Sequence, residues 1–256
     1  MDRTPPQLCR PAALRKEGRV IAAHQTMMGP QGGIDPYAGI NAFEFYGASS
    51  FTAAVFIKSL RSGVSSTTID WGDGATTTAT TGKYQHNYAS GPHVCTVPDD
   101  VYEFNDSNQT PYMANLRQIL NCVSQTLMRS PFRCRSSGIL TGNQRLSVPV
   151  LPAWAIDSVT GPITIELFNF SSFSGNVGDW IFPLCKQLST ITVHGKTCSQ
   201  MLAMSKFPYI TNCMQPTSAD YINTQIVCDD GVIQYDLDTY GRTDKPTASK
   251  YKVTYT

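Results

Sequence analysis

Apolar and polar residues alternate in a series of short segments between residues 41 and 97. Residues 41–46 place Phe43 and Phe45 on one face, and residues 51–60 form a longer run. Further segments, separated by residues typical of turns, lie at 67–71, 76–81, 84–88 and 93–97. Alternation with a period of two predicts strands, and short strands with regularly spaced turns predict a β-sandwich over residues 39–97.

A different spacing follows in residues 98–139, which we interpret as a linking region. Within residues 111–128, apolar side chains recur at the i, i+3 and i+4 positions of one helical face, namely Met113, Leu116, Ile119, Leu120 and Val123. This spacing predicts a helix in the linking region.

Apolar runs return at residues 146–151, 163–167 and 188–193. They lie roughly 20 to 25 residues apart, a period typical of stacked repeats. We therefore expect a short, degenerate β-solenoid of leucine-rich-repeat-like type over residues 140–242. It would end in a hairpin around Asp229-Asp230-Gly231. Residues 243–256 form a polar tail, in which residues 251–255 are expected to add an edge strand.

The first 38 residues contain proline and glycine too often for a long regular element. We interpret residues 1–38 as an extended arm without a core of its own, either disordered or held by a partner. The arm lacks the apolar region of a secretory signal, and no apolar run in the chain approaches the roughly 20 residues that span a bilayer. We therefore expect neither a secretory signal nor membrane insertion.

The composition is typical of an all-β protein with many turns, or of a surface that packs against other chains. Of the 256 residues, 41% are apolar and only 15% are charged, and the formal net charge is +1. So small a net charge gives no general attraction to nucleic acid, so no nucleic-acid partner is expected. The eight cysteines form no CxxC pair. We expect them to be buried thiols, with disulfides as the alternative and Cys122 with Cys134 as a plausible local pair.

Two stretches resemble known families. Thr68-Ile-Asp-Trp-Gly-Asp-Gly74, followed by Tyr84-Gln-His-Asn-Tyr-Ala89 and Val94-Cys-Thr-Val97, resembles the PKD-type domain, with His86 and Tyr88 at its H-x-Y positions. This resemblance implies an immunoglobulin-like β-sandwich used for structure and binding.

The second stretch runs from Leu188 to Tyr235. Val193-His-Gly-Lys-Thr197, Met204-Ser-Lys-Phe-Pro208 and Ile226-Val-Cys-Asp-Asp-Gly231 resemble the end of BspA-like leucine-rich-repeat proteins. Proteins that combine two such modules occur on bacterial surfaces and among bacteriophage virion proteins, which implies a display or adhesive role.

Candidate metal and phosphate sites each have a simpler structural interpretation, which we prefer. Asp70 and Asp73 supply only half of a calcium loop, whereas both carboxylates are expected to accept backbone N–H bonds in a tight turn with Trp71 in the core. His86 and His93 face each other across a hairpin in a metal-site interpretation, but a backbone-bonded histidine at the sandwich rim is simpler. Gly195-Lys196-Thr197 lacks the upstream glycine of a phosphate-binding loop.

Aromatic residues cluster between residues 168 and 182, and the sequence contains no recognisable catalytic motif. Phe168, Phe170, Phe173, Trp180 and Phe182 are expected mainly in the core, with an outward contact surface for protein or glycan as the alternative. No nucleophile-elbow motif occurs. We therefore predict no catalytic, cofactor-binding or metal-binding residues, no cofactor and no enzymatic activity.

These observations together favour a bacteriophage virion structural protein on the particle exterior, either associated with the tail or a fibre or decorating the head. We expect assembly in the host cytoplasm, other virion proteins and copies of the same chain as partners, and a host surface protein or glycan as a further ligand. A bacterial cell-surface adhesin and a glycan-degrading accessory protein are the alternatives.

Overall fold

The computed structural model describes residues 35–104, 113, 115–124, 126–127, 132–133, 140–174, 176, 179–242 and 247–256. The chain divides into two units, Met1–Pro36 and Tyr37–Thr256. The expected arm therefore lies outside the described residues except for its last four positions. The described part of the second unit is mainly β, as the sequence predicts.

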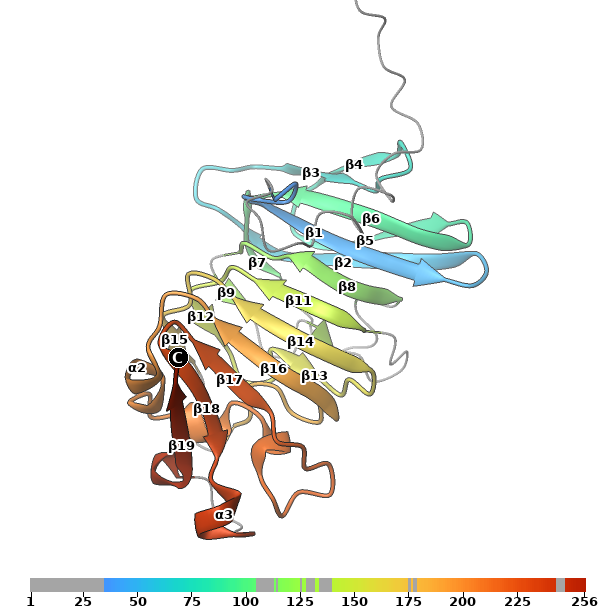
Figure 1. The fold of residues 1–256 in the computed structure, drawn as a ribbon. Coiled ribbons are helices and arrows are strands. Elements are labelled where there is room, and N and C mark those ends of the chain that lie inside the picture. Colours follow the sequence, from blue (N-terminus) through green and yellow to red (C-terminus); the bar gives the residue numbers. More distant parts are fainter. Residues whose placement is uncertain are drawn as a thin grey trace, which may run out of the picture. The chain divides into compact units, whose positions relative to one another are not determined.

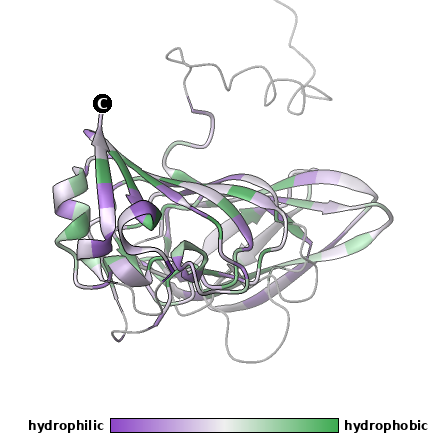
Figure 2. Cartoon of the chain, turned by 60° about the horizontal axis from the view of Figure 1, so that its bottom comes forward, coloured by the Kyte–Doolittle hydropathy of each residue, from purple (hydrophilic) through white to green (hydrophobic). Residues whose placement is uncertain are grey.

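The first sheet has five antiparallel strands in the order β4-β3-β6-β1-β8. Their bounds are β1 Ile40–Gly47, β3 Thr67–Asp70, β4 Thr76–Ala79, β6 Gly91–Pro98 and β8 Leu116–Asn121. Phe43 and Phe45 of β1 are fully buried, and β3 alternates strictly between buried and exposed residues. The period-two pattern of β3 thus arises because only one of its faces packs on the core, whereas residues 41–45 of β1 are all buried. Figure 2 shows hydrophobic and hydrophilic residues interleaved along the strands.

The second sheet has six strands in the order β15-β12-β9-β7-β2-β5. Their bounds are β2 Phe51–Leu60, β5 Gly82–Tyr88, β7 Val101–Phe104, β9 Thr126–Leu127, β12 Val150–Leu151 and β15 Ser172–Phe173. β5, β2 and β7 pair antiparallel, whereas β7, β9, β12 and β15 pair parallel. The pairing therefore changes direction along one continuous sheet.

The third sheet has the strand order β11-β14-β16-β17-β18-β19 and contains the strands expected at residues 163–167 and 188–193. The bounds of its strands are β11 Gly142–Leu146, β14 Pro162–Leu167, β16 Gln187–Val193, β17 Gln225–Cys228, β18 Gly231–Tyr235 and β19 Tyr251–Tyr255. The run expected at residues 146–151 overlaps β11 only at Leu146 and ends in β12 of the second sheet. β11 to β17 pair parallel and nearly in register, so that Gly142 pairs with Ile163 and Ile163 with Leu188. A small parallel pair, β10 Phe132–Arg133 with β13 Ile156–Asp157, completes the strands.

The chain ends in the predicted hairpin and edge strand. β17 and β18 pair antiparallel around Asp229 and Asp230, and β19 adds to β18. Gly231 is the first residue of β18, where a Cβ atom would lie 2.4 Å from the carbonyl oxygen of Thr254. Glycine is therefore needed at this position because the neighbouring strand approaches closely.

Helices are few and short in the part of the chain that the structure describes. They are α2 Cys198–Leu202, α3 Leu237–Tyr240, and the 3-10 turns η1 Phe207–Tyr209, η2 Asn212–Met214 and η3 Ala248–Lys250. A reciprocal capping box between Thr197 and Gln200 starts α2. None of these helices is long and apolar enough to cross a membrane.

The helix predicted within residues 111–128 is wrong, because residues 116–121 form strand β8. Two register shifts interrupt the pairing of β8 with β1, and they leave Arg117 and Leu120 as extra residues. Leu116, Ile119 and Cys122 consequently face the main core at a spacing of three, while Leu120 packs in a small cluster with Tyr37 and Ala42. Bulges thus give a strand the spacing of a helix.

The first and third sheets meet where β8 lies beside β11. Arg117 and Cys122 accept hydrogen bonds from the backbone N–H groups of Thr141 and Ser147, at 2.9 Å and 2.7 Å. The fully buried side chain of Gln144 completes this junction. One continuous core cluster extends from Phe43 to Tyr251. Figure 1 shows the strands from β6 through β1, β8, β11, β14 and β16 side by side.

Candidate functional site

The turn from Asp70 to Gly74 has the hydrogen bonds that the structural interpretation predicts. Asp70 Oδ1 accepts from the N–H of Gly72 at 2.9 Å, and Asp73 Oδ1 accepts from the N–H of Ala75 at 3.1 Å. Gly72 has a φ of 79°, and a Cβ atom there would lie 2.1 Å from a main-chain carbonyl oxygen of β6. Trp71 is 1% exposed. The carboxylates therefore fix the turn that inserts Trp71 into the core.

His86 is bonded to a carboxylate rather than to the backbone, which corrects the expected partner. Its Nε2 lies 2.7 Å from Asp73 Oδ2, and its ring stacks on Trp71 at 5.1 Å. Partial burial acts to raise the pKa of Asp73, but the hydrogen bonds from His86 and from the N–H of Ala75, together with the charge of His86, outweigh it, so this pKa lies below its usual value. The Asp73–His86 pair thus tethers β5 to the turn.

His93 does not approach His86 as a shared metal site requires, because Tyr88 lies between them. The ring of Tyr88 stacks on His93 at 4.2 Å and meets His86 edge-on at 4.7 Å. Its hydroxyl donates to the carbonyl oxygen of Trp71 at 2.6 Å. Among the described residues, no group of three or more metal-ligating side chains occurs.

The Gly195-Lys196-Thr197 segment uses its N–H groups internally. Gly195 donates to Asp229 Oδ1 at 3.1 Å, and Cys198 donates to Asp230 Oδ1 at 2.7 Å. Two carboxylates therefore occupy the donors that a phosphate would need, in agreement with the rejection of a phosphate-binding loop.

The aromatic group divides between core and surface. Phe170 and Phe182 are buried, and Phe173 packs against the core. Phe168 is half-buried and stacks on His194 at 4.2 Å, and Trp180 meets Tyr209 edge-on at 5.4 Å. The core interpretation thus holds for three of these five side chains.

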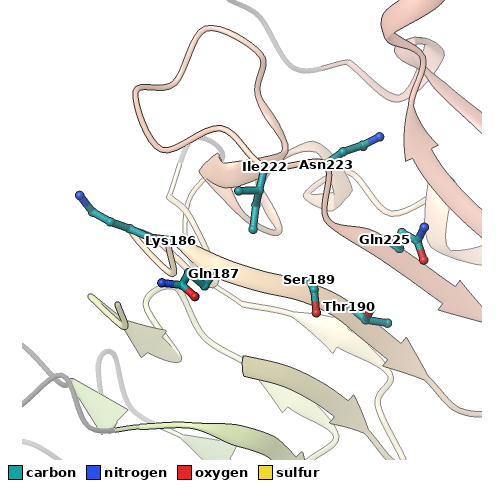
Figure 3. A pocket seen from close by; sticks show the side chains of 7 residues that line it. All are labelled: Lys186, Gln187, Ser189, Thr190, Ile222, Asn223 and Gln225. Atoms are coloured by element: carbon teal, nitrogen blue, oxygen red, sulfur yellow. The ribbon is translucent and has the colours of Figure 1, made fainter. Parts of the chain in front are cut away.

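A shallow hollow opens where β16 and the segment before β17 diverge (Figure 3). Its volume is about 490 Å³, and it is lined by Lys186, Gln187, Ser189, Thr190, Ile222, Asn223 and Gln225. Pairing between the two strands begins only at Thr190 and Gln225, so the earlier residues separate. The hydroxyl of Thr224 donates to the carbonyl oxygen of Leu188 at 2.8 Å and holds the floor together.

The chemistry of the hollow is that of hydrogen-bonding recognition. Amides and hydroxyls dominate, and of the described residues that line it none is acidic. The ammonium group of Lys186 lies 2.8 Å from Asp220 Oδ1, and this hydrogen bond raises the pKa of Lys186. Lys186 therefore stays charged at neutral pH and is suited to binding rather than to proton transfer.

The hollow continues into a polar face on the parallel strands. Register places Asn143, Thr164, Thr190 and Gln225 in one outward row across β11, β14, β16 and β17. The Thr164 hydroxyl donates to Asn143 Oδ1 at 2.9 Å. The sequence alone does not group these four polar positions, because only the strand register assembles them into a row.

No protein-family model, no curated protein and no solved structure matches this chain.

Proposed function

We propose that this chain is a non-enzymatic structural protein on the exterior of a bacteriophage particle, associated with the tail or a fibre or decorating the head. In this proposal residues 39–97 form an immunoglobulin-like sandwich of PKD type and residues 140–242 a short leucine-rich-repeat-like solenoid. The chain assembles with other virion proteins and with copies of itself. It then binds a host surface protein or glycan through the outward face of the parallel sheet.

The observation that carries the binding role is the polar row on the parallel strands together with the hollow at its end. Parallel pairing in register holds Asn143, Thr164, Thr190 and Gln225 at fixed spacings, so their donors and acceptors are preorganised. Shallow surfaces of amides and hydroxyls suit ligands that are rich in hydroxyl and carbonyl groups, such as glycans or extended protein segments.

The continuity of the core supports a structural role. The core cluster extends from Phe43 to Tyr251, and the junction at Gln144 joins the sheets of the two modules by hydrogen bonds. A core shared between the described sheets keeps the binding face in a fixed orientation, as a display or linking subunit requires.

Proteomics of purified particles from the cells that encode this chain tests the virion assignment. We expect its peptides in intact particles at a constant ratio to the main capsid or tail protein, and a matching density in an electron-microscopy reconstruction. Absence of the chain from particles, combined with its presence on the bacterial envelope, would contradict the virion role and support an adhesin.

A pair of matched variants tests the binding face. Gln225→Ala removes one hydrogen-bonding side chain from the hollow, whereas Gln85→Ala makes the same change at an exposed position of β5. Loss of one hydrogen bond should weaken binding of the labelled full chain to host cells by about three- to tenfold. Equal binding by both variants would show that this face is not the one used.

A further inference from the structure

Two thiols meet inside the C-terminal part of the molecule. Cys198 is the first residue of α2 and is fully buried, and Cys228 is the last residue of β17 and is 8% exposed. Both side chains belong to the same core cluster, and the backbone N–H of Cys198 donates to Asp230 Oδ1, two residues after Cys228, at 2.7 Å. The thiols also influence each other's pKa, because their mutual contact acts to lower that of Cys198 and to raise that of Cys228. The two cysteines are thirty positions apart in the sequence, and they do not form a CxxC motif.

The backbone around the thiols is held by three hydrogen bonds between the loop before α2 and the hairpin turn. Cys198 N–H donates to Asp230 Oδ1 at 2.7 Å, Gly195 N–H donates to Asp229 Oδ1 at 3.1 Å, and Asp229 N–H donates to the Lys196 carbonyl at 2.9 Å. These bonds fix the backbone on both sides of the pair without involving either sulfur atom. A disulfide there requires the sulfur atoms to reach a bond length of about 2.05 Å.

We propose that Cys198 and Cys228 are a disulfide site that closes when the protein meets an oxidising environment. With a low-molecular-weight disulfide such as oxidised glutathione, one protein thiolate attacks a sulfur of the oxidant and releases one glutathione. The second protein thiolate then displaces the bound glutathione, which forms the Cys198–Cys228 bond. The protein loses two electrons, and one oxidised glutathione becomes two reduced molecules.

The surroundings make this reaction slow at neutral pH. Burial raises the pKa of Cys228, and burial together with a hydrogen bond to Asp230 raises that of Cys198. The neighbouring charges of Asp229 and Asp230 act in the same direction on Cys228. Because the thiolate is the reacting form, the pair stays reduced in a reducing cytoplasm and reacts faster under alkaline, oxidising conditions.

Three other described cysteines make polar contacts of their own. The Cys213 thiol donates to the main-chain carbonyl of Cys185 at 3.1 Å, the Cys185 thiol to that of Ile156 at 3.6 Å, and the sulfur of Cys122 lies beside Ser124 at 3.6 Å. Cys134, the partner expected for Cys122 from the sequence, lies outside the described residues. The geometry thus favours a pair that local sequence spacing does not suggest.

The disulfide would close a loop that forms part of the hollow. This loop, residues 198–228, contains Ile222, Asn223 and Gln225, which form one wall of the hollow. A cross-link over a loop of this length reduces the freedom of the unfolded chain and is expected to raise the melting temperature by roughly 5–10 °C. The inference itself stands whether or not the proposed virion role is correct.

Peptide mapping of the full chain tests the site. The reduced protein is incubated with oxidised glutathione at pH 8.5, quenched by alkylation, digested without reductant and analysed by mass spectrometry. We expect a peptide pair linked through Cys198 and Cys228, and a rise in melting temperature that dithiothreitol reverses. Persistent glutathione adducts without the link, a different pairing, or no reaction would each overturn the proposal.

Variants separate this site from general oxidation. Cys228→Ser should abolish both the linked peptide and the rise in melting temperature. Cys213→Ser is the matched control, since it changes another buried thiol in the same loop but keeps a hydrogen-bond donor, and it should leave both unchanged. If the Cys228→Ser protein still shows the rise in melting temperature, the disulfide is not its cause.

Discussion

Substitution of Gln144 by leucine tests whether the two halves of the described chain form one cooperative unit. The Gln144 side chain accepts a hydrogen bond from the N–H of Ile119 at 2.7 Å. It also donates to the carbonyl oxygens of Thr141 at 2.8 Å and Gly142 at 3.2 Å. Gln144 and Ile119 are both 0% exposed, so water cannot replace the lost partner. Leucine has a similar volume, so the substitution removes the hydrogen bonds with little change in packing.

The expected cost follows from the groups left without partners. A buried donor without a partner costs about 1–3 kcal/mol, and the two carbonyls, which are only partly buried, add about 1 kcal/mol. We therefore expect Gln144→Leu to lower the free energy of unfolding by about 2–4 kcal/mol. For a domain of this size, the melting temperature should fall by roughly 5–15 °C.

Urea denaturation followed by fluorescence and by circular dichroism measures this change. Gln118→Leu is the graded control, because its side chain makes one hydrogen bond at the same junction, to the carbonyl of Asn143, and is only half-buried. This control should cost about 1 kcal/mol or less. A Gln144→Leu protein within about 0.5 kcal/mol of the wild type would refute the role of the buried amide. Two separate unfolding transitions in the wild type would refute the single cooperative unit.

The remaining predictions concern the turn and its aromatic neighbours. Gly72→Ala forces a Cβ atom into a main-chain carbonyl at positive φ and should cost at least about 2 kcal/mol in urea denaturation; a neutral effect would contradict this geometry. Tyr88→Phe removes the donor to the buried Trp71 carbonyl and should cost about 1–2 kcal/mol, measured in the same way, with an unchanged stability counting against the bond. His86 lowers the pKa of Asp73, so the stabilisation by this pair is complete above the usual Asp pKa and is lost as pH falls through the lowered value. The difference in melting temperature between wild type and Asp73→Asn should therefore shrink between pH 5 and about pH 2, and a constant difference would exclude this linkage.

Strands with a solvent-facing side could be predicted from the sequence. β3 alternates between buried and exposed residues, because only one of its faces is buried, and turn residues mark the β17–β18 hairpin. β1 is buried on both faces over residues 41–45, but Phe43 and Phe45 alternate with more polar neighbours in the sequence. The two-residue strands β9, β12 and β15 are too short to show any period. β8 was mistaken for a helix because its bulges shift the buried positions to a spacing of three. Local patterns thus carry information only where the pairing is regular.

The candidate sites were harder to predict, because tertiary pairing brings their residues together. The turn contacts of Asp70 and Asp73 are local and were predicted correctly. In contrast, the hollow combines residues 186–190 with residues 222–225, and the pair Cys198–Cys228 depends on the packing of α2 against the hairpin. A single sequence does not show that such residues are neighbours in the fold, because their separation along the chain does not determine the distance between them in space.

The arrangement of the sheets gives the first sheet a structural role at one end of the parallel strands. A stack of parallel strands has two open ends, and each end needs a cover to protect its unpaired backbone groups. At one end β18 and β19 close the stack by antiparallel pairing. At the other end β8 is paired on one side with β1, and on its other side it accepts hydrogen bonds from the residues flanking β11. β8, paired on its other side with β1, thus caps the parallel stack, and the first sheet shares the core of the stack. Removal of residues 37–98 would expose an edge of β8 and leave the stack prone to self-association.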